Sequence, residues 1–457
     1  MRDVTIIGGG FSGTALAAHL LERLPSGARL RLLNAGAPLA RGLAYGTQSS
    51  LHLLNVPAAR MAWHPERPTD FVDWLQAQGR PAAEKSFVPR SWYGEYLGAR
   101  LQEAVQRRPD VAWEHQVARI SRLAPHAGGW TLFDEHGART ESQDVVLALG
   151  HFAPADPHPD LAALPSPRYV RDPWQADACA GLDRDAPIAI IGAGLTMLDL
   201  LVSLDHAGHR GPVLCLSRRG IAPLPHRDNE LQPPAYRTPD DWLSGAAVRA
   251  WVRELREAAR QLQAPQDWRD LWVAMRARTP DLWQRLPLPE RRRFLRHLQV
   301  YWDVHRHRAA PTAMATVHRL QAEGRLRLQA GRLQGVQDTG AALALQWKPR
   351  GQDALQTVAV QRIFNCTGPS SRLSQDRSGL FPSLAADGRL LPCPLGLGLQ
   401  TDADYHLLDA TGRPQRGLRY VGPLLRAQHW EATAVPELRQ HALHLARALT
   451  RGHAPAD

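Results

Sequence analysis

A glycine-rich turn at the start of the chain restricts the possible folds more than any other feature. A short β-branched run, residues 4–7, is typical of a buried strand and leads into Gly8, Gly10 and Gly13. The first glycine allows a tight turn, the second lets a pyrophosphate approach the backbone, and the third lets the following helix pack on the strand. The helix N-terminus presents free N–H groups and the positive end of its dipole to phosphates. We therefore expect a dinucleotide-binding unit here, with Phe11 and Ser12 also at the cofactor.

The second predicted strand, residues 28–34, ends about 20 positions after the glycines. An acidic residue usually holds the ribose hydroxyls at this point, but this chain has Asn34, whose amide can still accept and donate hydrogen bonds. No arginine stands there to meet a 2′-phosphate. The first unit is therefore predicted to bind FAD rather than NADP.

A polar, irregular loop follows, over residues 42–47 and 52–61. We interpret it as the loop that lies against the isoalloxazine ring, with His52, Leu54 and Asn55 at the cofactor; the alternative is a packed loop crossing the sheet edge. Residues 111–150 read as short strands that end at Gly150, where the chain can return close beneath a dinucleotide. A proline-rich connector, residues 153–187, then predicts a domain boundary.

The strand–turn–helix pattern begins again beyond this connector. Gly192 and Gly194 occupy the first two glycine positions, and Leu195 and Thr196 begin the helix. The third glycine position holds Met197, so we expect this helix and strand to lie slightly farther apart. The next strand ends in two arginines, at the place where a ribose 2′-phosphate is met. This second unit is predicted to bind NADPH, through the glycines and through Arg218 and Arg219.

Residues 225–320 are rich in tryptophan and arginine and have a helical period, which predicts a helical insertion with breaks at Pro265, Pro280 and residues 287–289. Arg306 and Arg308 are candidates for an anionic substrate or the NADPH phosphates, with a solvated or ion-paired role as the alternative. His305 and His307, two positions apart, diverge on a helix, so no metal site is predicted.

The rest of the chain repeats the ending of the first half. Residues 325–368 read as strands closing at Gly368, and residues 418–423 supply a last strand that includes Gly422. A final helix, entered around Val435, can point its N–H groups at the flavin edge that becomes negative on reduction. We predict a discontinuous FAD domain, residues 1–165 and 330–457, and an NADPH domain, residues 166–329.

Composition narrows the function classes. The 457 residues exceed one ordinary core, and no apolar run approaches the length needed to cross a bilayer. The net charge of +11 is nearly all arginine, spread without a basic block, so nucleic-acid binding is not expected. The four cysteines form no CxxC, which excludes a disulfide reductase. Since the first strand begins at the N-terminus, where a signal peptide would lie, we expect a cytoplasmic protein.

Both glycine turns, the residue 42–47 and 52–60 loop, the Ser217–Gly220 segment and the 432–439 helix start resemble those of the FAD/NAD(P)-binding oxidoreductases. The chain is similar to the two-dinucleotide-domain flavin monooxygenases, including enzymes that N-hydroxylate amino acids. The resemblance implies an α/β fold of two Rossmann-like domains in a glutathione-reductase-like arrangement. Two positions depart from it: Asn34 replaces the usual acid, and Gly422-Pro423 stands where many related flavoproteins have Gly-Asp.

The resemblance implies an FAD- and NADPH-dependent monooxygenase. Reduced flavin captures O2 as a C4a-hydroperoxide and passes one oxygen to a small amine or amino acid, with Asn55 as the polar group beside flavin N5/C4a. A flavin reductase or dehydrogenase of the same fold remains an alternative, as does a non-catalytic dinucleotide-binding protein.

Overall fold

The computed structural model describes residues 2–36, 38–81, 83–164, 168–227 and 236–451. These residues divide into two compact units. Unit 1 comprises Met1–Thr47, Pro57–Phe152 and Ser371–Asp457, and unit 2 comprises Gln48–Val56 and Ala153–Ser370.

Unit 1 is built on a six-stranded sheet in the order β15-β16-β7-β1-β2-β3. Five of its strands run parallel, and β15 pairs antiparallel with β16 at one edge. The bounds in chain order are β1 (Asp3–Ile7), β2 (Arg29–Asn34), β3 (Ala112–Val117), β7 (Asp144–Leu147), β15 (His406–Leu408) and β16 (Pro414–Tyr420). Because the central strands are buried on both faces, they read as continuous apolar runs rather than alternating ones.

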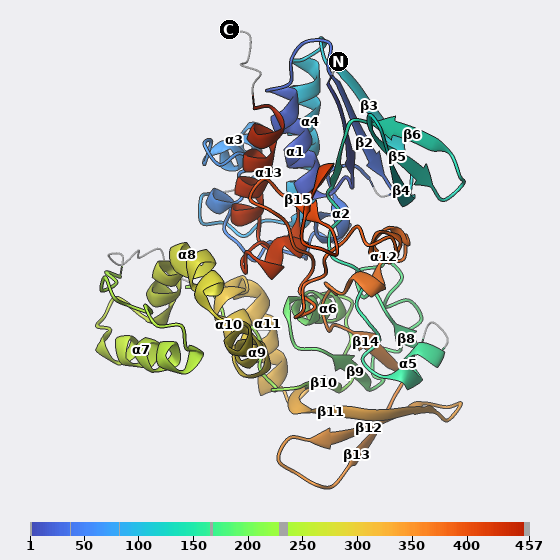
Figure 1. Ribbon diagram of the computed structural model, residues 1–457. Coiled ribbons are helices and arrows are strands. Elements are labelled where there is room, and N and C mark those ends of the chain that lie inside the picture. The colour runs from blue at the N-terminus through green and yellow to red at the C-terminus, as the bar shows by residue number, and fades with distance from the viewer. Residues whose placement is uncertain (1, 37, 82, 165–167, 228–235, 452–457) are drawn as a thin grey trace. The chain divides into compact units, whose positions relative to one another are not determined.

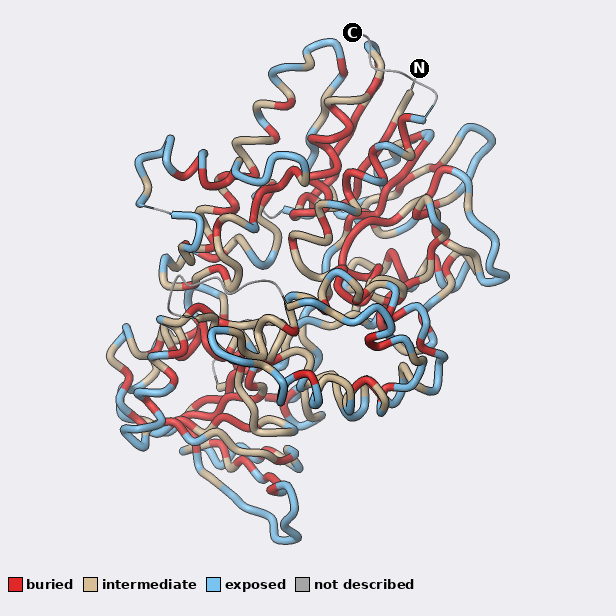
Figure 2. Tube along the Cα trace, turned by 90° about the vertical axis from the view of Figure 1, so that its left-hand side faces the viewer, coloured by how far each residue is buried: buried red, intermediate tan, exposed pale blue. Residues whose placement is uncertain are grey.

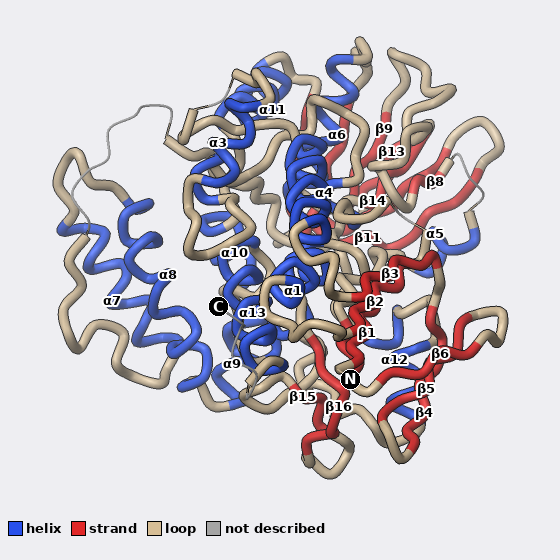
Figure 3. Tube along the Cα trace, turned by 90° about the horizontal axis from the view of Figure 1, so that it is seen from above, coloured by secondary structure: helices blue, strands red, loops and turns tan. Residues whose placement is uncertain are grey.

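Helices cover one face of this sheet and a small sheet covers the other (Figure 3). Helix α1 is buried along its whole length because α4 and α13 pack against it. The helices of unit 1 are α1 (Phe11–Leu21), α2 (Gly42–Tyr45), α3 (Asp70–Ala77), α4 (Arg90–Gln106), α12 (Leu380–Ala386) and α13 (Val435–Leu449), with 3-10 turns η1 (Ala58–Arg60), η2 (Leu373–Gln375) and η3 (Pro423–Ala427). The covering sheet is antiparallel, with β4 (Ile120–His126), β5 (Gly129–Asp134) and β6 (Arg139–Ser142).

Unit 2 contains a seven-stranded sheet in the order β13-β12-β11-β10-β9-β14-β8. The strands are β8 (Tyr169–Val170), β9 (Ile188–Ile191), β10 (Val213–Ser217), β11 (Leu326–Asp338), β12 (Leu343–Pro349), β13 (Gln356–Val360) and β14 (Arg362–Asn365). Strand β11 pairs in parallel with β10 as far as Ala330. From Gly331 onward it extends beyond β10 and pairs antiparallel with β12. The buried residues follow the strands, whereas the turn after β12 is exposed (Figure 2).

Two apolar clusters hold unit 2 together, one on each face of the sheet. The first joins β9 and β10 to α6 (Leu195–His206) and α11 (Pro311–Ala322). The second joins the other face to α5 (Pro159–Ala163) and to apolar residues of β11, β12 and β13, including Trp347. The dinucleotide-type half of unit 2 therefore has a core of its own.

The insertion between β10 and β11 is helical, as expected. Helices α7 (Val248–Gln261), α8 (Trp268–Arg285), α9 (Leu288–His297) and α10 (Gln299–Arg306) contact one another and lead into α11 (Figure 1). The predicted break at Pro280 is wrong: this proline lies inside α8, where the neighbouring Thr279 and Leu282 are buried and hold the helix in place. Residues 228–235 of the predicted insertion lie outside the described residues.

The predicted α/β fold with two Rossmann-like units is confirmed. The division into units differs from the expected boundaries in three places, the first being residues 153–165, which lie in unit 2. Residues 330–370 lie in unit 2, because β11–β14 hydrogen-bond into its sheet. Residues 48–56 also cluster with unit 2, and the segment 42–60, expected to be irregular, contains the single helical turns α2 and η1. Among the described helices, none combines the length and apolar character that crossing a bilayer requires.

Candidate functional site

The glycine turn of unit 1 is shaped by two close backbone approaches. Gly8 has φ +116°, and a Cβ there would lie 2.6 Å from the carbonyl oxygen of Ala148 on the neighbouring strand end. A Cβ on Gly13 would lie only 1.9 Å from the carbonyl oxygen of Gly8. No side chain can be accommodated at that distance, so both glycines are required to seat α1 on the sheet.

The middle of this turn is open. A Cβ on Gly10 would meet only the Cα of Gly42, at 3.7 Å. Gly10 is the N-cap of α1, and neither a side-chain cap nor a first-turn acid serves this helix end. Phe11 and Ser12, which follow it, are buried. Buried N–H groups at an uncapped helix start require an acceptor, and a pyrophosphate supplies one. The turn therefore fits a dinucleotide.

The end of β2 lies against this turn through Asn34. Its side-chain oxygen accepts a hydrogen bond from the Gly9 N–H at 3.3 Å, and a Cβ on Gly9 would lie 2.9 Å from the Asn34 Cγ. Asn34 is almost fully buried. The structure thus places a neutral amide, rather than a carboxylate, at the position predicted to hold a ribose.

The other predicted cofactor residues of unit 1 lie at the carboxyl ends of its parallel strands or at a helix start. Exposed Gly150 follows β7, and Gly422 follows β16, its parallel neighbour, with φ +145°. Tyr420 donates a hydrogen bond to the Leu149 carbonyl at 2.8 Å, and its hydroxyl lies 2.7 Å from where a Gly422 Cβ would stand. Val435 begins α13, which has no side-chain cap.

Unit 2 contains a second glycine turn, residues 192–197, and the two turns with the helix starts that follow them are called glycine cradles below. The second cradle differs from the first in its third glycine position, which holds Met197. Gly192 has φ +105°, and a Cβ there would lie 2.2 Å from the Cys366 carbonyl oxygen. Gly194, the N-cap of α6, is exposed with nothing within 4 Å of a Cβ, and α6 has neither a side-chain cap nor a first-turn acid. Leu195 and Thr196, its first residues, are half-buried. The uncapped start of α6 therefore also fits a phosphate.

Met197 takes the place of the third glycine in unit 2. It is fully buried, and its Sδ lies 3.4 Å from the Cys215 Sγ on β10. Burial raises the pKa of Cys215 to about 12, and it also raises the pKa of Cys366. These thiols are therefore protonated packing groups near neutral pH rather than nucleophiles.

Residues 48–56 of the loop predicted to lie against a flavin belong to unit 2. The Nε2 of buried His52 lies 2.9 Å from the Ser203 hydroxyl on α6, and Leu54 is buried. The His226 Nε2 donates to the Asn55 carbonyl at 2.9 Å, while the Asn55 side-chain amide makes no hydrogen bond within the described part of the chain. Gly368, with φ +85°, follows β14 in this unit too. The predicted flavin residues are thus divided between the two units.

Arg218 and Arg219 follow β10 and line a pocket of about 730 Å³ in unit 2. Sequence reasoning missed four further cations that line it, which are Arg296, Arg332, Lys348 and Arg350. They come from α9, β11, β12 and the following turn, and the pairing of β11 with β12 sets Arg332 opposite Lys348. The predicted substrate residues Arg306 and Arg308 do not line this pocket; the Arg308 guanidinium lies over the Trp268 ring instead.

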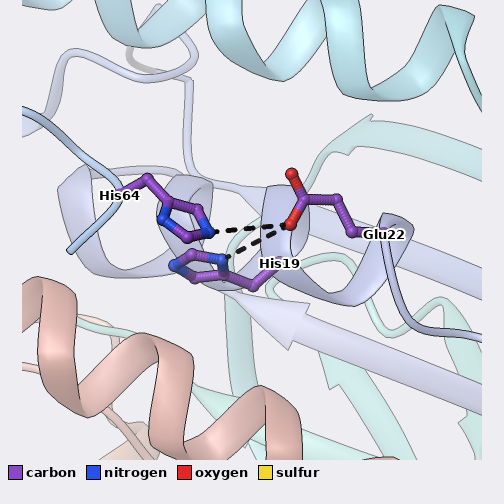
Figure 4. Close-up of side chains that lie close together, drawn as sticks. All are labelled: His19, Glu22 and His64. Carbon is purple, nitrogen blue, oxygen red and sulfur yellow. Dashed lines mark ion pairs between the residues drawn. The ribbon is translucent and has the colours of Figure 1, made fainter. Parts of the chain in front are cut away.

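A second group of ionisable side chains, His19, Glu22 and His64, lies at the far end of α1 (Figure 4). The Glu22 Oε2 is 4.0 Å from His19 Nδ1 and 3.9 Å from His64 Nε2. Burial lowers the pKa of both histidines, that of His64 to about 4. Burial alone would raise the pKa of Glu22, but His19 and two arginines lower it to about 2.

Two histidines and a glutamate can bind a metal ion, but the groups around His19, Glu22 and His64 favour ion pairs and hydrogen bonds within the protein instead. Glu22 already contacts Arg23 at 3.0 Å and Arg67 at 3.5 Å, and these cations compete with a metal ion. The Glu66 N–H donates to His64 Nδ1, so the proton of the neutral ring is on Nε2, which faces Glu22. Metal coordination through Nε2 would require that proton to leave.

Residues 5–152 match the family model described as FAD-NAD(P)-binding, whereas no curated protein matches the chain. The match covers all of the first glycine turn and ends at the boundary of unit 1.

Solved structures match over nearly the whole chain at low identity. The cadaverine monooxygenase of Erwinia amylovora, bound to FAD, has a TM-score of 0.69 and 13% identity and covers 100% of this chain and 96% of its own. The ornithine N-hydroxylase of Kutzneria sp. 744, with reduced FAD, NADP+ and L-ornithine, has a TM-score of 0.65 and 14% identity over 99% of both chains. The thioredoxin reductase of Lactococcus lactis has a TM-score of 0.53 and 11% identity over 98% of both.

These similarities confirm the expected resemblance to FAD/NAD(P)-binding oxidoreductases and the two-domain fold.

Proposed function

We propose that this chain, an FAD-NAD(P)-binding protein with the fold of the two-domain flavin oxidoreductases, is an FAD- and NADPH-dependent monooxygenase that N-hydroxylates a small amine or amino acid. The observation that carries the proposal is the presence of two uncapped glycine cradles with different surroundings in one chain. In the first cradle the neutral amide of Asn34 lies at the end of the second strand. In the second cradle Arg218 and Arg219 follow the corresponding strand. One cradle thus suits a dinucleotide without a 2′-phosphate and the other a dinucleotide with one.

FAD fits the cradle of unit 1 because the helix start is buried, uncapped and free of acids, while Gly10 leaves room for a pyrophosphate. We assign Asn34 to the ribose. Within unit 1, the residues proposed to contact FAD are Gly8, Gly10, Phe11, Ser12, Gly13, Asn34, Gly150, Gly422 and Val435, while His52, Leu54, Asn55 and Gly368 of unit 2 stay predicted cofactor residues.

NADPH is assigned to the cradle of unit 2. Gly192, Gly194, Leu195 and Thr196 receive its pyrophosphate, and Arg218 and Arg219 its 2′-phosphate, for which a guanidinium is a strong charge-assisted donor.

A bound flavin supplies hydride acceptance and oxygen activation, so the protein has to bind, orient and exclude water rather than perform acid–base chemistry. The Asn55 side-chain amide, which has no hydrogen bond within the described residues, is proposed to donate to the reacting centre. Arg306 and Arg308 are proposed to face an anionic group of the substrate.

The choice of an amine substrate is supported by the fold shared with proteins named as ornithine, lysine and cadaverine hydroxylating enzymes. The decisive experiment is to purify the protein, record its visible spectrum and follow NADPH oxidation in air over a panel of amines and amino acids. We expect a yellow protein that forms an N-hydroxylated product and little hydrogen peroxide with its own substrate. A colourless protein that does not take up FAD would contradict the proposal.

A flavin reductase that does not transfer oxygen is the second candidate, because the fold is also that of a thioredoxin reductase. Mixing the NADPH-reduced protein with O2 in a stopped-flow instrument separates the two. A monooxygenase holds a transient species whose absorbance differs from those of oxidised and reduced flavin, whereas a simple reductase reoxidises without it.

The role of Asn55 has its own test, Asn55→Asp in protein that retains FAD. We expect NADPH consumption to become uncoupled, with hydrogen peroxide replacing product. Full coupling in this variant would show that Asn55 does not contact the reacting centre.

A further inference from the structure

The basic pocket of unit 2 is lined by five arginines whose side chains have no partner among the described residues. Several other arginines of the insertion and the sheet are held by carboxylates or carbonyls, as Arg227 is by Asp270 at 2.6 Å and Arg362 by the Ala178 carbonyl at 3.0 Å. By contrast, the side chains of Arg218, Arg219, Arg296, Arg332 and Arg350 make neither an ion pair nor a hydrogen bond with any described residue. Lys348, also at the pocket, contacts only the exposed Asp353. The pocket therefore concentrates the positive charge of five arginines and Lys348.

Strand pairing places two of these charges directly against each other. Arg332 on β11 is the register partner of Lys348 on β12, and both side chains line the pocket. Like charges directly opposite on neighbouring strands destabilise a sheet. The hairpin keeps this unfavourable pair at one side of a pocket, which is the arrangement expected where an anion offsets the repulsion.

The pocket also lies where the ribose end of a dinucleotide is expected. Arg218 and Arg219 follow the carboxyl end of β10, and Arg332 follows Ala330, the last β11 residue paired with β10. In a Rossmann unit the end of this second strand reads the ribose 2′ position. A volume of about 730 Å³ is ample for a phosphorylated adenosine. Asp303 is the only acid among the described residues that line it.

We propose that the β11–β12 hairpin, through Arg332, Lys348 and Arg350, forms part of the 2′-phosphate site together with Arg218 and Arg219. The selectivity for a 2′-phosphorylated nucleotide is then shared between the strand-end pair and the hairpin. The proposal rests on the assignment of NADPH to unit 2. It adds residues that are recruited by the extension of β11 beyond its parallel partner.

The test uses the purified full-length protein and isothermal titration with 2′,5′-ADP, 3′,5′-ADP, 5′-AMP and inorganic phosphate at low salt. We expect 2′,5′-ADP to bind about 30-fold more tightly than 5′-AMP, as for a phosphate held by exposed charge-assisted hydrogen bonds. Arg332→Gln lowers this ratio about fivefold to tenfold. Arg327→Gln is the matched control: it removes one exposed arginine from the same strand outside the pocket and leaves the ratio unchanged.

An unchanged ratio in Arg332→Gln would overturn the proposal. Equal binding of 3′,5′-ADP and 2′,5′-ADP would overturn it too, because the pocket would then not read the 2′ position. Phosphate that binds as tightly as 2′,5′-ADP would indicate an adventitious ion only, which is equally contrary. Thermal melting with each nucleotide checks that every variant is folded.

The outcome is separable from that of the proposed function. If the protein neither holds flavin nor oxidises NADPH, the proposed function fails, while nucleotide titration still reports on the pocket. If NADPH is oxidised with the same preference over NADH in Arg332→Gln as in the wild type, the function stands and the hairpin plays no part.

Discussion

The two glycine cradles share a strand–turn–helix topology but differ in the residue at the third glycine position and in the residues at the end of the second strand. In unit 1 the third glycine is enforced, since a Cβ on Gly13 would lie 1.9 Å from the Gly8 carbonyl oxygen. In unit 2 the equivalent Met197 is fully buried and contacts Cys215. The strand that follows ends in buried Asn34 in the first unit, whereas in the second exposed Arg218 comes directly after the last strand residue, Ser217.

This difference teaches that the turn and the strand end are separate determinants. The turn sets how closely helix and strand approach, whereas the strand end sets which ribose substituent is accepted. The same backbone unit can therefore be used twice in one chain for two nucleotides.

The largest effect is expected from Gly13→Ala. The new methyl group cannot fit beside a backbone carbonyl, so α1 must shift, and we expect a loss of about 3 kcal/mol or more in stability together with loss of flavin binding. Urea unfolding and the flavin absorbance of the purified protein measure both. Gly10→Ala is the control, because its Cβ meets only one atom at 3.7 Å, and it should remain as stable as the wild type. Flavin retention in Gly13→Ala would contradict the geometry of the cradle.

Met197→Gly converts the second cradle to the sequence of the first. Because Met197 is fully buried, we expect a cavity and a loss of about 2–4 kcal/mol, with no gain in NADPH affinity. Met197→Leu keeps the volume and should cost less than about 1.5 kcal/mol. Chemical denaturation followed by tryptophan fluorescence provides the comparison. Unchanged stability of Met197→Gly would show that the turn tolerates either residue.

Removing the arginine pair, Arg218→Gln with Arg219→Gln, tests the strand end. We expect the Kd for NADPH to rise about 30-fold, equivalent to about 2 kcal/mol, while the weaker binding of NADH is unchanged. Titration at several salt concentrations measures the loss and its screening. Equal losses for NADPH and NADH would show that the pair acts on the pyrophosphate instead.

The far ends of the two cradle helices also differ, and acid should reveal it. Buried His19 and His64 lie together at the end of α1, whereas α6 ends beside the ion pair of Asp205 and Arg319 and is followed by buried His209, whose pKa burial also lowers. Burial lowers the pKa of His64 from 6.5 to about 4, so the unfolded chain binds the extra proton between these values. The contribution of His64 to the free energy of unfolding is therefore fully present above pH 6.5 and is lost as the pH falls toward 4.

At pH 5 we expect protonation of His64 in the unfolded chain to lower the stability of unit 1 by about 2 kcal/mol relative to pH 7. Hydrogen exchange of α1 and α6 at both pH values measures it, and His64→Gln should reduce the extra acid sensitivity of α1. If His64→Gln leaves the acid sensitivity of α1 unchanged, His64 has no such role.

The smallest effect is expected from Asn34→Asp, which restores the acid usual at this position. The carboxylate can still accept the Gly9 N–H and a ribose hydroxyl, so FAD affinity should change by less than about 1 kcal/mol. Asn34→Leu removes the acceptor and should weaken FAD binding about fivefold. Flavin titration of the apoprotein distinguishes these outcomes, and equal affinity of both variants would remove Asn34 from the ribose site.

The sequence predicts the two cradles well because their glycine requirements are local. Gly8 and Gly192 both have positive φ, and a Cβ at either would clash with a carbonyl from the end of the neighbouring strand. Only glycine satisfies this constraint, so it is visible in the sequence. The order of strand, turn and helix is equally local, so the fold class follows from it.

Features that depend on long-range pairing could not be predicted. The basic pocket requires the register that sets Arg332 opposite Lys348, and neither residue is distinctive by itself. The placement of residues 48–56 with unit 2 rests on contacts such as that of His52 with Ser203, which are 151 positions apart. Because proline disrupts isolated helices, the sequence predicts that a helix ends at Pro280. Burial of the neighbouring residues keeps α8 continuous through it.

The interleaved connectivity of the units has a consequence for how the protein is made. The chain passes from one unit to the other after Thr47, Val56, Phe152 and Ser370, and β16 and α13 come from the last segment. On the ribosome, the edge of β7 and one side of α1 therefore stay uncovered until nearly the whole polypeptide has been synthesised. Unit 2 can complete its sheet before the last segment is made, so a released chain that ends at residue 370 should resist protease within unit 2 and be cut within unit 1.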